Sequence, residues 1–235
     1  MSFFEPFNIA FQLLFGFDAE LYDVIFLSLQ VSGTAVITAL CLGIPLGALL
    51  AIKRFYGRSA LLVVSKTMLG MPPVVIGLLV YVLISRSGPL GFLDILYTPQ
   101  AMMLAQFILI LPLSIALSHQ IFERLHAELH LFFASLGLGA FKRILTLLSE
   151  ARYELVTLGM ICFGRAISEI GAVILVGGNI KYLTRVMTSS IALETSKGNI
   201  AFALALGIVL MMIALLINLL SHLLSQSVLK EATNG

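Results

Sequence analysis

Five long apolar stretches, separated by shorter polar segments, dominate the sequence. They cover residues 24–52, 61–85, 100–120, 155–178 and 199–224. Each is long enough to cross a bilayer as an α-helix. The first, with 29 residues, would form a helix of about 43 Å, which exceeds a hydrocarbon core of about 30 Å, so it should tilt or project. The pattern predicts an all-α transmembrane bundle of five helices.

Glycines and prolines interrupt these stretches. Gly43 and Gly47 frame a small-xxx-small pattern that allows two helix backbones to approach closely. The pair Pro72-Pro73 removes two backbone donors, so we expect a kink or an unwound segment there. Irregular backbone at membrane depth must be buried or face a watery cavity. Met71, Pro72 and Pro73 are therefore predicted to line a pathway or gate, and a packed kink without transport contact is the alternative.

The N-terminal segment, residues 1–21, has a different pattern. It is rich in phenylalanine but is broken by Glu5, Pro6, Asn8 and Gln12, and its apolar part is too short to span. We expect a helix lying at the membrane interface. The first residues lack the positive charge of a cleavable signal peptide.

Composition supports a membrane protein. The chain has 235 residues, of which 60% are hydrophobic and 11% charged, with a mean hydropathy of +1.07. These values lie outside the range of soluble globular proteins. The net charge of +2 gives no reason to expect nucleic-acid binding. Cys41 and Cys162 lie within apolar stretches and are expected to be packing residues.

The distribution of basic residues predicts the orientation. Nine lysines and arginines fall on one side of the predicted spans and four on the other, and Arg165 lies within a span. By the positive-inside rule the N-terminus is outside and the C-terminus is cytoplasmic.

The fourth stretch contains two ionisable residues, Arg165 and Glu169. Each charge at membrane depth costs about 2.5–3.5 kcal/mol, so such residues are rarely without a role. On a continuous helix the two lie four residues apart on one face and can pair. With Ser168 they are candidates for the translocation pathway or gate, and a purely structural buried pair is the alternative.

A polar segment of about thirty residues, 121–151, separates the third and fourth stretches. It mixes apolar and charged positions, and Gly137 and Gly139 interrupt it. We expect two short amphipathic helices joined by a sharp turn. On the cytoplasmic side such a pair could insert into a groove of a partner, and a helix resting on the membrane surface is the alternative.

The sequence gives no reason to expect an enzyme. It contains no GxxxxGK[ST] loop, so it has no nucleotide-hydrolysing site of that kind. His126 and His130 have a spacing that could share a metal, but Glu128 lies on the opposite side of the helix and does not complete a zincin motif. No catalytic residue, metal site or cofactor is expected.

Several blocks resemble ABC-importer permeases. The segment around Gly137 has the position and the central glycine of their signature loop, EAA-x3-G-x9-I-x-L-P, of which only that glycine and an apolar residue at Leu147 match. Four further blocks are similar to the tungstate-type branch, and molybdate and sulfate permeases share parts of them. These are SLQVSGTAVITALCLGIPLGALLA (28–51), MLGMPPVVIGLLVYVLISRSGPLG (68–91), FGRAISEIGAVILVGGNI (163–180) and TRVMTSSIALETSKG (184–198).

The resemblance implies a type I ABC-importer permease in the cytoplasmic (inner) membrane. Such a subunit works as a homodimer with cytoplasmic ABC ATPase subunits and an extracytoplasmic oxyanion-binding protein. The permease domain would cover 22–229, with 121–151 as its cytoplasmic coupling loop and 230–235 as a tail. The loop residues implied to contact the ATPase are Ser135, Leu136, Gly137, Leu138, Gly139 and Ala140. Those implied to face the binding protein are Asn179, Arg185, Glu194, Thr195 and Lys197.

The function implied is ATP-driven uptake of a tetrahedral oxyanion, most of all tungstate. Basic residues of the outer loop, Lys181, Arg185 and Lys197, could attract such an anion. Molybdate, sulfate or another small solute is the alternative cargo. A stand-alone channel or secondary carrier, using Arg165 and Glu169 as a charge relay, is the alternative from another class.

Overall fold

The computed structural model describes residues 5–137 and 139–234, and helices are the regular elements in this part of the chain. The elements are α1 (Glu5–Phe15), α2 (Ala19–Ile52), α3 (Arg58–Leu69), α4 (Pro73–Ile84), η1 (Gly91–Leu93), α5 (Pro99–Glu128), α6 (His130–Ser135), α7 (Ala140–Glu150), α8 (Arg152–Ile167), α9 (Gly171–Gly177), α10 (Met187–Ser196) and α11 (Ile200–Asn234). The predicted all-α class is confirmed.

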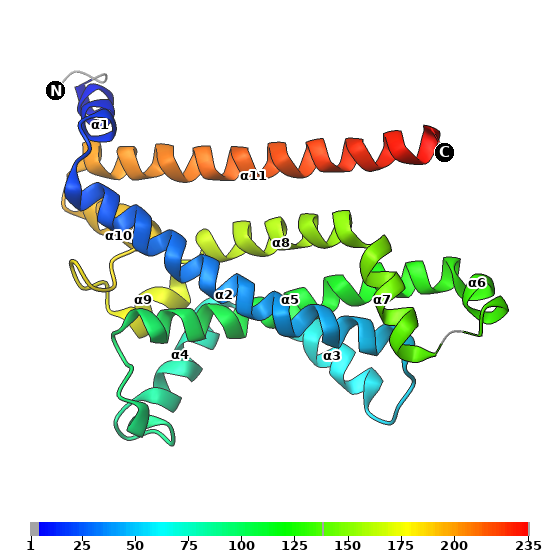
Figure 1. Ribbon diagram of the computed structural model, residues 1–235. Helices are drawn as coiled ribbons and strands as arrows, with labels where there is room; N and C mark the ends of the chain where they lie inside the picture. Colours follow the sequence, from blue (N-terminus) through cyan, green and yellow to red (C-terminus); the bar gives the residue numbers. More distant parts are fainter. Residues whose placement is uncertain (1–4, 138, 235) are drawn as a thin grey trace.

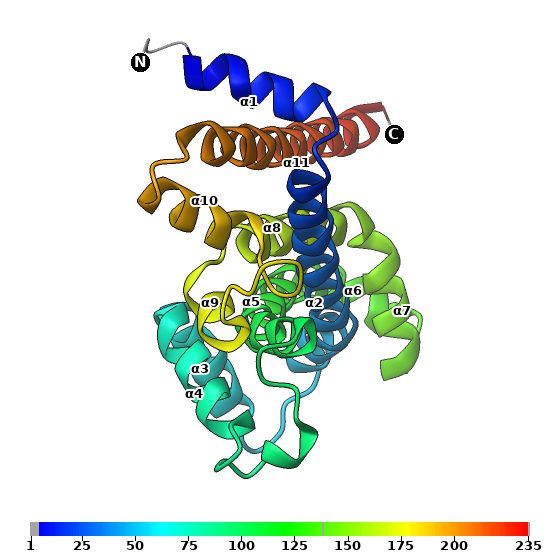
Figure 2. The same ribbon diagram turned by 90° about the vertical axis from the view of Figure 1, so that its left-hand side faces the viewer.

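The long helices share one general direction. In Figure 1, α2, α5 and α11 extend along the length of the molecule, and the shorter α8 lies between α5 and α11; α6 and α7 are at the right-hand end and α9 and α10 at the left. Figure 2 shows α1 and α11 on one side of the bundle and α3 and α4 on the opposite side. The arrangement leaves the segment between α5 and α8 and the segment between α9 and α10 at opposite ends.

Among the described residues, three helices are long and apolar enough to cross a membrane: α2, α5 and the 200–221 part of α11. They correspond to the first, third and fifth predicted stretches. α2 begins earlier than predicted, at Ala19, because the Asp18 carboxylate accepts a hydrogen bond from the backbone N–H of Leu21 (2.9 Å) and caps the helix. α5 continues to Glu128, beyond the predicted end at 120.

The second and fourth predicted spans are not single helices. Residues 61–85 form α3 and α4, which meet at an angle of 108°, and residues 155–178 form α8 and α9, which meet at 57°. The five-span prediction holds only if each bent pair counts as one span. The first break is the interruption predicted at Pro72-Pro73, whereas the second is a correction to the continuous helix expected through Glu169.

α2 and α5 pack closely on each other, as the glycine pattern predicts. A Cβ added at Gly47 would lie 2.0 Å from the Ser118 Oγ and 2.8 Å from the backbone N of His119. At this crossing the Ser118 hydroxyl donates to the backbone oxygen of Gly43 (3.2 Å). Small residues and a serine hydroxyl therefore hold the two backbones together, as is common between membrane helices.

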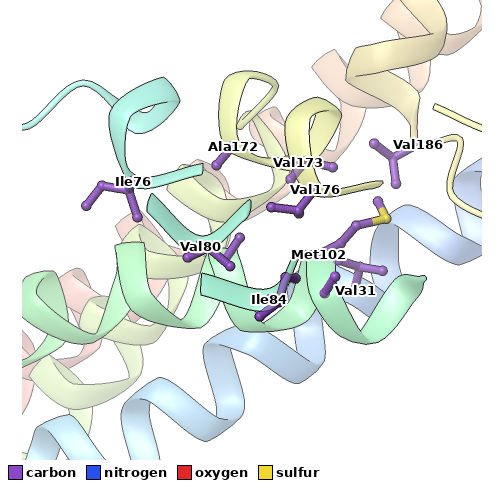
Figure 3. Packing of buried hydrophobic residues seen from close by; sticks show 11 residues of the cluster. Val31, Ile76, Val80, Ile84, Met102, Ala172, Val173, Val176 and Val186 are labelled. Atoms are coloured by element: carbon purple, nitrogen blue, oxygen red, sulfur yellow. The ribbon is translucent and has the colours of Figure 1, made fainter. Parts of the chain in front are cut away.

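The main apolar cluster lies between the two bent pairs. Figure 3 shows Ile76, Val80 and Ile84 of α4 against Ala172, Val173 and Val176 of α9, with Met102 of α5 beside them. α4 and α9, the second halves of the broken pairs, are thus packed on each other. Movement of one requires the other to move or to repack.

The N-terminal helix α1 has 11 residues and packs on α11. Its exposed side chains are of both kinds: the apolar Ile9, Phe11 and Phe15, and the polar Glu5, Asn8 and Gln12. A short helix with large apolar side chains exposed agrees with the predicted interfacial segment, whose position in the membrane stays a prediction.

Candidate functional site

The two helix breaks lie side by side. A Cβ added at Gly171, the first residue of α9, would lie 2.5 Å from the Val74 Cγ2 at the start of α4. The candidate pathway residues therefore belong to two adjacent breaks, although they come from distant parts of the sequence. They are Met71, Pro72 and Pro73 at the first break and Arg165, Ser168 and Glu169 at the second.

Glu169 forms hydrogen bonds with α8, α9 and α10 around the second break. Its Oε2 accepts a hydrogen bond from the Arg165 Nη1 (3.2 Å), and its Oε1 accepts one from the backbone N–H of Gly171 (2.9 Å). The Thr188 hydroxyl of α10 donates to its backbone oxygen (3.0 Å). The predicted Arg165–Glu169 pair is confirmed, but α8 ends at Ile167, so the carboxylate also caps the free N–H of the next helix.

Gln106 of α5 also contacts the second break, and it was not among the residues predicted from the sequence. Its Nε2 donates to the backbone oxygen of Ala166 (3.0 Å), which also accepts from the N–H of Glu169 (3.1 Å). The end of α8 thus has its carbonyl satisfied by one side chain, and the start of α9 has its N–H satisfied by another. Irregular backbone at membrane depth requires such partners. An amide away from the ends of the apolar stretch 100–120 was the available signal.

Arg165 and Glu169 differ in their exposure. The Glu169 side chain is 6% exposed, whereas that of Arg165 is 47% exposed on this chain. The space lined by Gln106, Arg165 and Glu169 is too narrow for a water molecule. A guanidinium at this depth is stable only beside water or protein.

The segment between α5 and α8 forms two short helices, α6 and α7, joined by a turn, as predicted. Gly137 in this turn has φ +58, whereas Gly139 has φ −67 and begins α7 as its N-cap. Only the first needs the left-handed conformation that glycine adopts without strain. Ser135, Leu136, Gly139 and Ala140 flank the turn, and Leu138 lies outside the described residues.

The same segment is anchored on the bundle. Phe133 of α6 and Leu147 of α7 are buried with Ala48 of α2 and Phe122 of α5. Leu131 and Leu136 remain exposed. α6 and α7 are thus fixed to the ends of two spanning helices while they present apolar side chains outward, as a docking element requires.

The outer candidates do not share one environment. Thr195 and Lys197 are exposed, Asn179 is half-buried, and Glu194 is buried at the end of α10. Arg185 is largely buried and lies 3.7 Å from Glu20. The expected outer loop therefore contains a helix, and the burial of Glu194 and Arg185 leaves little of them for a partner to contact.

The basic residues expected to attract an oxyanion are each paired with a carboxylate. The Lys181 Nζ lies 2.7 Å from the Glu20 Oε2, and the Lys197 Nζ lies 2.9 Å from the Glu194 Oε1. Arg185 lies 3.7 Å from Glu20, so Lys181 and Arg185 share one carboxylate, and the buried Nε of Arg185 has no hydrogen-bond partner in the described part of the chain. The charge of Lys197 is thus matched by Glu194, whereas Glu20 matches the charges of Lys181 and Arg185 only in part.

The Glu194 contacts predict a pH dependence. The hydrogen bond from Lys197 lowers the pKa of Glu194, with help from the Asn199 amide (3.0 Å). A carboxyl group whose folded pKa is depressed adds stability above its unfolded pKa and loses it as the pH falls through the folded value. We expect wild type to lose more thermal stability than Glu194→Gln between pH about 6 and about 3. Melting curves in detergent at both pH values test this, and equal losses in the two proteins would contradict it.

No group of three His, Cys, Asp or Glu side chains converges as a metal site within residues 5–137 and 139–234. His126 and His130 contact each other edge to face, with ring centroids 6.3 Å apart, and His126 stacks on Phe133. His126 therefore packs between α5 and α6, whereas His130 is exposed.

Comparison with known proteins agrees with the architecture. Residues 43–230 match the family of binding-protein-dependent transport system inner membrane components. The tungstate uptake system permease protein TupB of Peptoclostridium acidaminophilum is 42% identical over 207 residues, covering 88% of this chain and 91% of the relative. TupB of Campylobacter jejuni is 38% identical over 88% of this chain and 87% of its own length. A probable anion ABC transporter permease of Haloferax volcanii is 39% identical over 81% and 84%, respectively.

The match confirms the predicted resemblance, the inner-membrane location and the assignment as a transporter component rather than an ATPase. The spanning helices, the two breaks and the segment between α5 and α8 then belong to one transporter subunit. This chain belongs to the family of inner membrane components of binding-protein-dependent transport systems.

Proposed function

We propose that this chain is the permease subunit of an ATP-driven importer of a tetrahedral oxyanion, and that the oxyanion is tungstate. The observation that carries the proposal is the similarity to two tungstate uptake permeases over 88% of the chain. The family supports association with an ATPase and with a binding protein. Molybdate, sulfate or another small solute is the alternative cargo.

The translocation pathway is proposed to pass between two copies of the chain, beside the two breaks. The exposed side of Arg165 supports this, because that charge needs water or protein next to it. A pathway on a two-fold axis would receive the same residues from both copies. Met71, Pro72, Pro73, Ser168 and Glu169 would contribute to its lining or gate from each copy.

The orientation is proposed to be N-terminus outside and C-terminus cytoplasmic, following the basic residues. The permease domain then covers 22–229, with the interfacial segment 1–21 before it and the tail 230–235 after it. The segment 121–151, with its turn at Gly137, lies in the cytoplasm and docks on the ATPase. Leu131 and Leu136, which are exposed on it, are suited to such contact.

Reconstitution tests the proposal. The chain is purified with its ATPase, placed in liposomes and supplied with loaded binding protein, and ATP-dependent uptake of tungstate, molybdate and sulfate is compared. Preferential uptake of tungstate is expected. Preference for another anion would change the cargo, and transport without ATPase would establish the stand-alone carrier instead.

The two glycines of the turn provide a sharper test of coupling. Gly137→Ala forces an alanine into φ +58, at a cost of about 1–2 kcal/mol, and should distort the turn. Gly139→Ala meets no atom within 4 Å and keeps an ordinary φ, so it is the matched control. We expect several-fold lower transport-coupled ATP hydrolysis in Gly137→Ala only. Equal activity of both variants would show that the turn is not needed for coupling.

A further inference from the structure

Gln106 has a buried amide oxygen without a partner. The residue lies on α5 and is 3% exposed, and its Oε1 has no hydrogen-bond partner in the described part of the chain. Turning the amide over does not help, because its Nε2 donates to the backbone oxygen of Ala166 (3.0 Å), which can only accept. A buried carbonyl oxygen that stays unsatisfied is costly, so a folded protein that retains one needs a reason for it.

The space beside this oxygen contains one suitable donor. It is lined by apolar side chains of α5 and α8, by the carboxylate of Glu169 and by Arg165. Among these lining side chains, the guanidinium alone carries N–H donors. Within residues 5–137 and 139–234 that guanidinium donates to Glu169 only (3.2 Å), which leaves several of its N–H groups available.

Two other partners fit the free oxygen less well. A fully ionised tetrahedral oxyanion has acceptors and no donors, so it cannot form a hydrogen bond with a carbonyl oxygen. A water molecule does not fit into the space. The guanidinium of Arg165 is therefore the partner that the chemistry of the site favours.

We propose that Gln106 is a positioning residue for Arg165, whose guanidinium donates to the Gln106 amide oxygen in a second conformation of the break. The inference rests on the proposed function and adds a movement beside the pathway. In the present conformation the Arg165 side chain is 47% exposed and turns an open side to the pathway. In the second conformation it is withdrawn between Glu169 and Gln106, and its charge is turned away from the cargo.

The break after α8 gives the freedom for this movement. α8 ends at Ile167 and α9 begins at Gly171, so no continuous helix holds the residues between them. The narrow space must widen before a guanidinium can enter it, which links the position of Arg165 to the packing of α8 on α5. Helix shifts of about 1–2 Å accompany many switching transitions. Alternation between the two positions presents a positive charge to an incoming anion and withdraws it for release.

Moving the carboxylate from position 169 to position 106 tests the inference. Glu169→Gln leaves Arg165 without a negative partner, and adding Gln106→Glu places a carboxylate at the proposed second acceptor. We expect Gln106→Glu/Glu169→Gln to melt about 2–4 °C above Glu169→Gln in detergent at pH about 8, because the arginine again has a charged partner. A melting temperature equal to or below that of Glu169→Gln would show that Arg165 does not reach Gln106 and would overturn the inference.

Two other backgrounds show whether the gain depends on the arginine. In Arg165→Gln/Glu169→Gln, the same Gln106→Glu should give no gain, since it buries a carboxyl group with no cation to pair with. In the wild-type chain it should lower the melting temperature, because two carboxylates then compete for one guanidinium. A gain of equal size without Arg165 would also overturn the inference.

ATP-driven uptake into liposomes reports the movement itself. Gln106→Met removes the second acceptor and leaves the Arg165–Glu169 pair in place, so we expect several-fold slower uptake with a melting temperature within a few degrees of wild type. Gln120→Met, the same change at an exposed position of α5, is the matched control and should transport as wild type does. Equal uptake by both variants would overturn the second conformation as a step of transport.

The failures of the two proposals are distinguishable, because a melting temperature does not depend on transport. Wild type that takes up its oxyanion with ATP, without any arginine-dependent gain from Gln106→Glu, would overturn the role of Gln106 alone. Wild type that takes up no oxyanion would overturn the proposed function and the step of transport with it.

Discussion

Gly47→Val is expected to yield little folded protein. The valine Cβ would lie 2.0 Å from the Ser118 Oγ, 2.8 Å from the His119 backbone N and 3.0 Å from the Ile115 backbone oxygen. Two of these atoms belong to the α5 backbone, so no side-chain rotation removes the clash. Overpacking costs about 1–3 kcal/mol when side chains can adjust, and we expect at least about 3 kcal/mol here because two helices must separate.

The same helix provides the control. Gly33 also lies in α2, and a Cβ added there has no neighbour within 4 Å. Gly33→Val should therefore purify as wild type does, whereas Gly47→Val should aggregate or melt at a much lower temperature. Size-exclusion profiles and thermal unfolding in detergent measure both. A Gly47→Val protein with a wild-type profile would show that α2 and α5 do not approach as closely as described.

The close α2–α5 contact shows what the sequence could predict. The glycine pattern identified the surface on α2 that another helix approaches, because small residues at that spacing have few other uses in a membrane helix. It could not identify the partner. The serines that meet these glycines, Ser114 and Ser118, are common residues whose role depends on the facing helix.

The sequence predicted one of the two helix breaks but not the other. Pro72-Pro73 predicts an interruption from local chemistry alone. The break after Ile167 has no proline, and the spacing of Arg165 and Glu169 suits an unbroken helix equally well. It is held by tertiary contacts, from Gln106 of α5 and Thr188 of α10, which a single sequence does not show.

The outer surface was predicted least well. The sequence indicates which residues carry charge, but partner and burial decide what a charge does. Glu20 lies 161 positions from Lys181 in the sequence, yet its carboxylate pairs with the Lys181 ammonium group.

Glu169→Ala is expected to destabilise the protein by about 3 kcal/mol and to abolish transport. It leaves the Gly171 N–H without an acceptor, which costs about 1–3 kcal/mol for a buried group. It also leaves Arg165 unpaired at membrane depth, at a cost below the usual 2.5–3.5 kcal/mol because that side chain is 47% exposed. Thermal unfolding and liposome uptake measure the two effects.

Glu169→Gln separates the loss of the hydrogen bond to Gly171 from the loss of the charge beside Arg165. Its amide oxygen can still accept from the Gly171 N–H, while the negative charge is gone. It should fold with an intermediate stability. The double variant Arg165→Gln/Glu169→Gln should recover part of that loss, since it removes the unpaired charge as well.

Glu154→Gln is the matched control. Glu154 of α8 pairs with Arg124 of α5, and their side chains are 37% and 56% exposed, respectively. Exposed pairs contribute about 0–1 kcal/mol, so this variant should stay close to wild type. The comparison separates the roles of two carboxylates. Glu154 lies within α8 and pairs with an exposed arginine, whereas Glu169, in the break after α8, accepts from the backbone N–H of Gly171 and pairs with Arg165. If Glu169→Ala were as stable and active as Glu154→Gln, the break would be held by Gln106 and Thr188 alone, and Arg165 would need no partner.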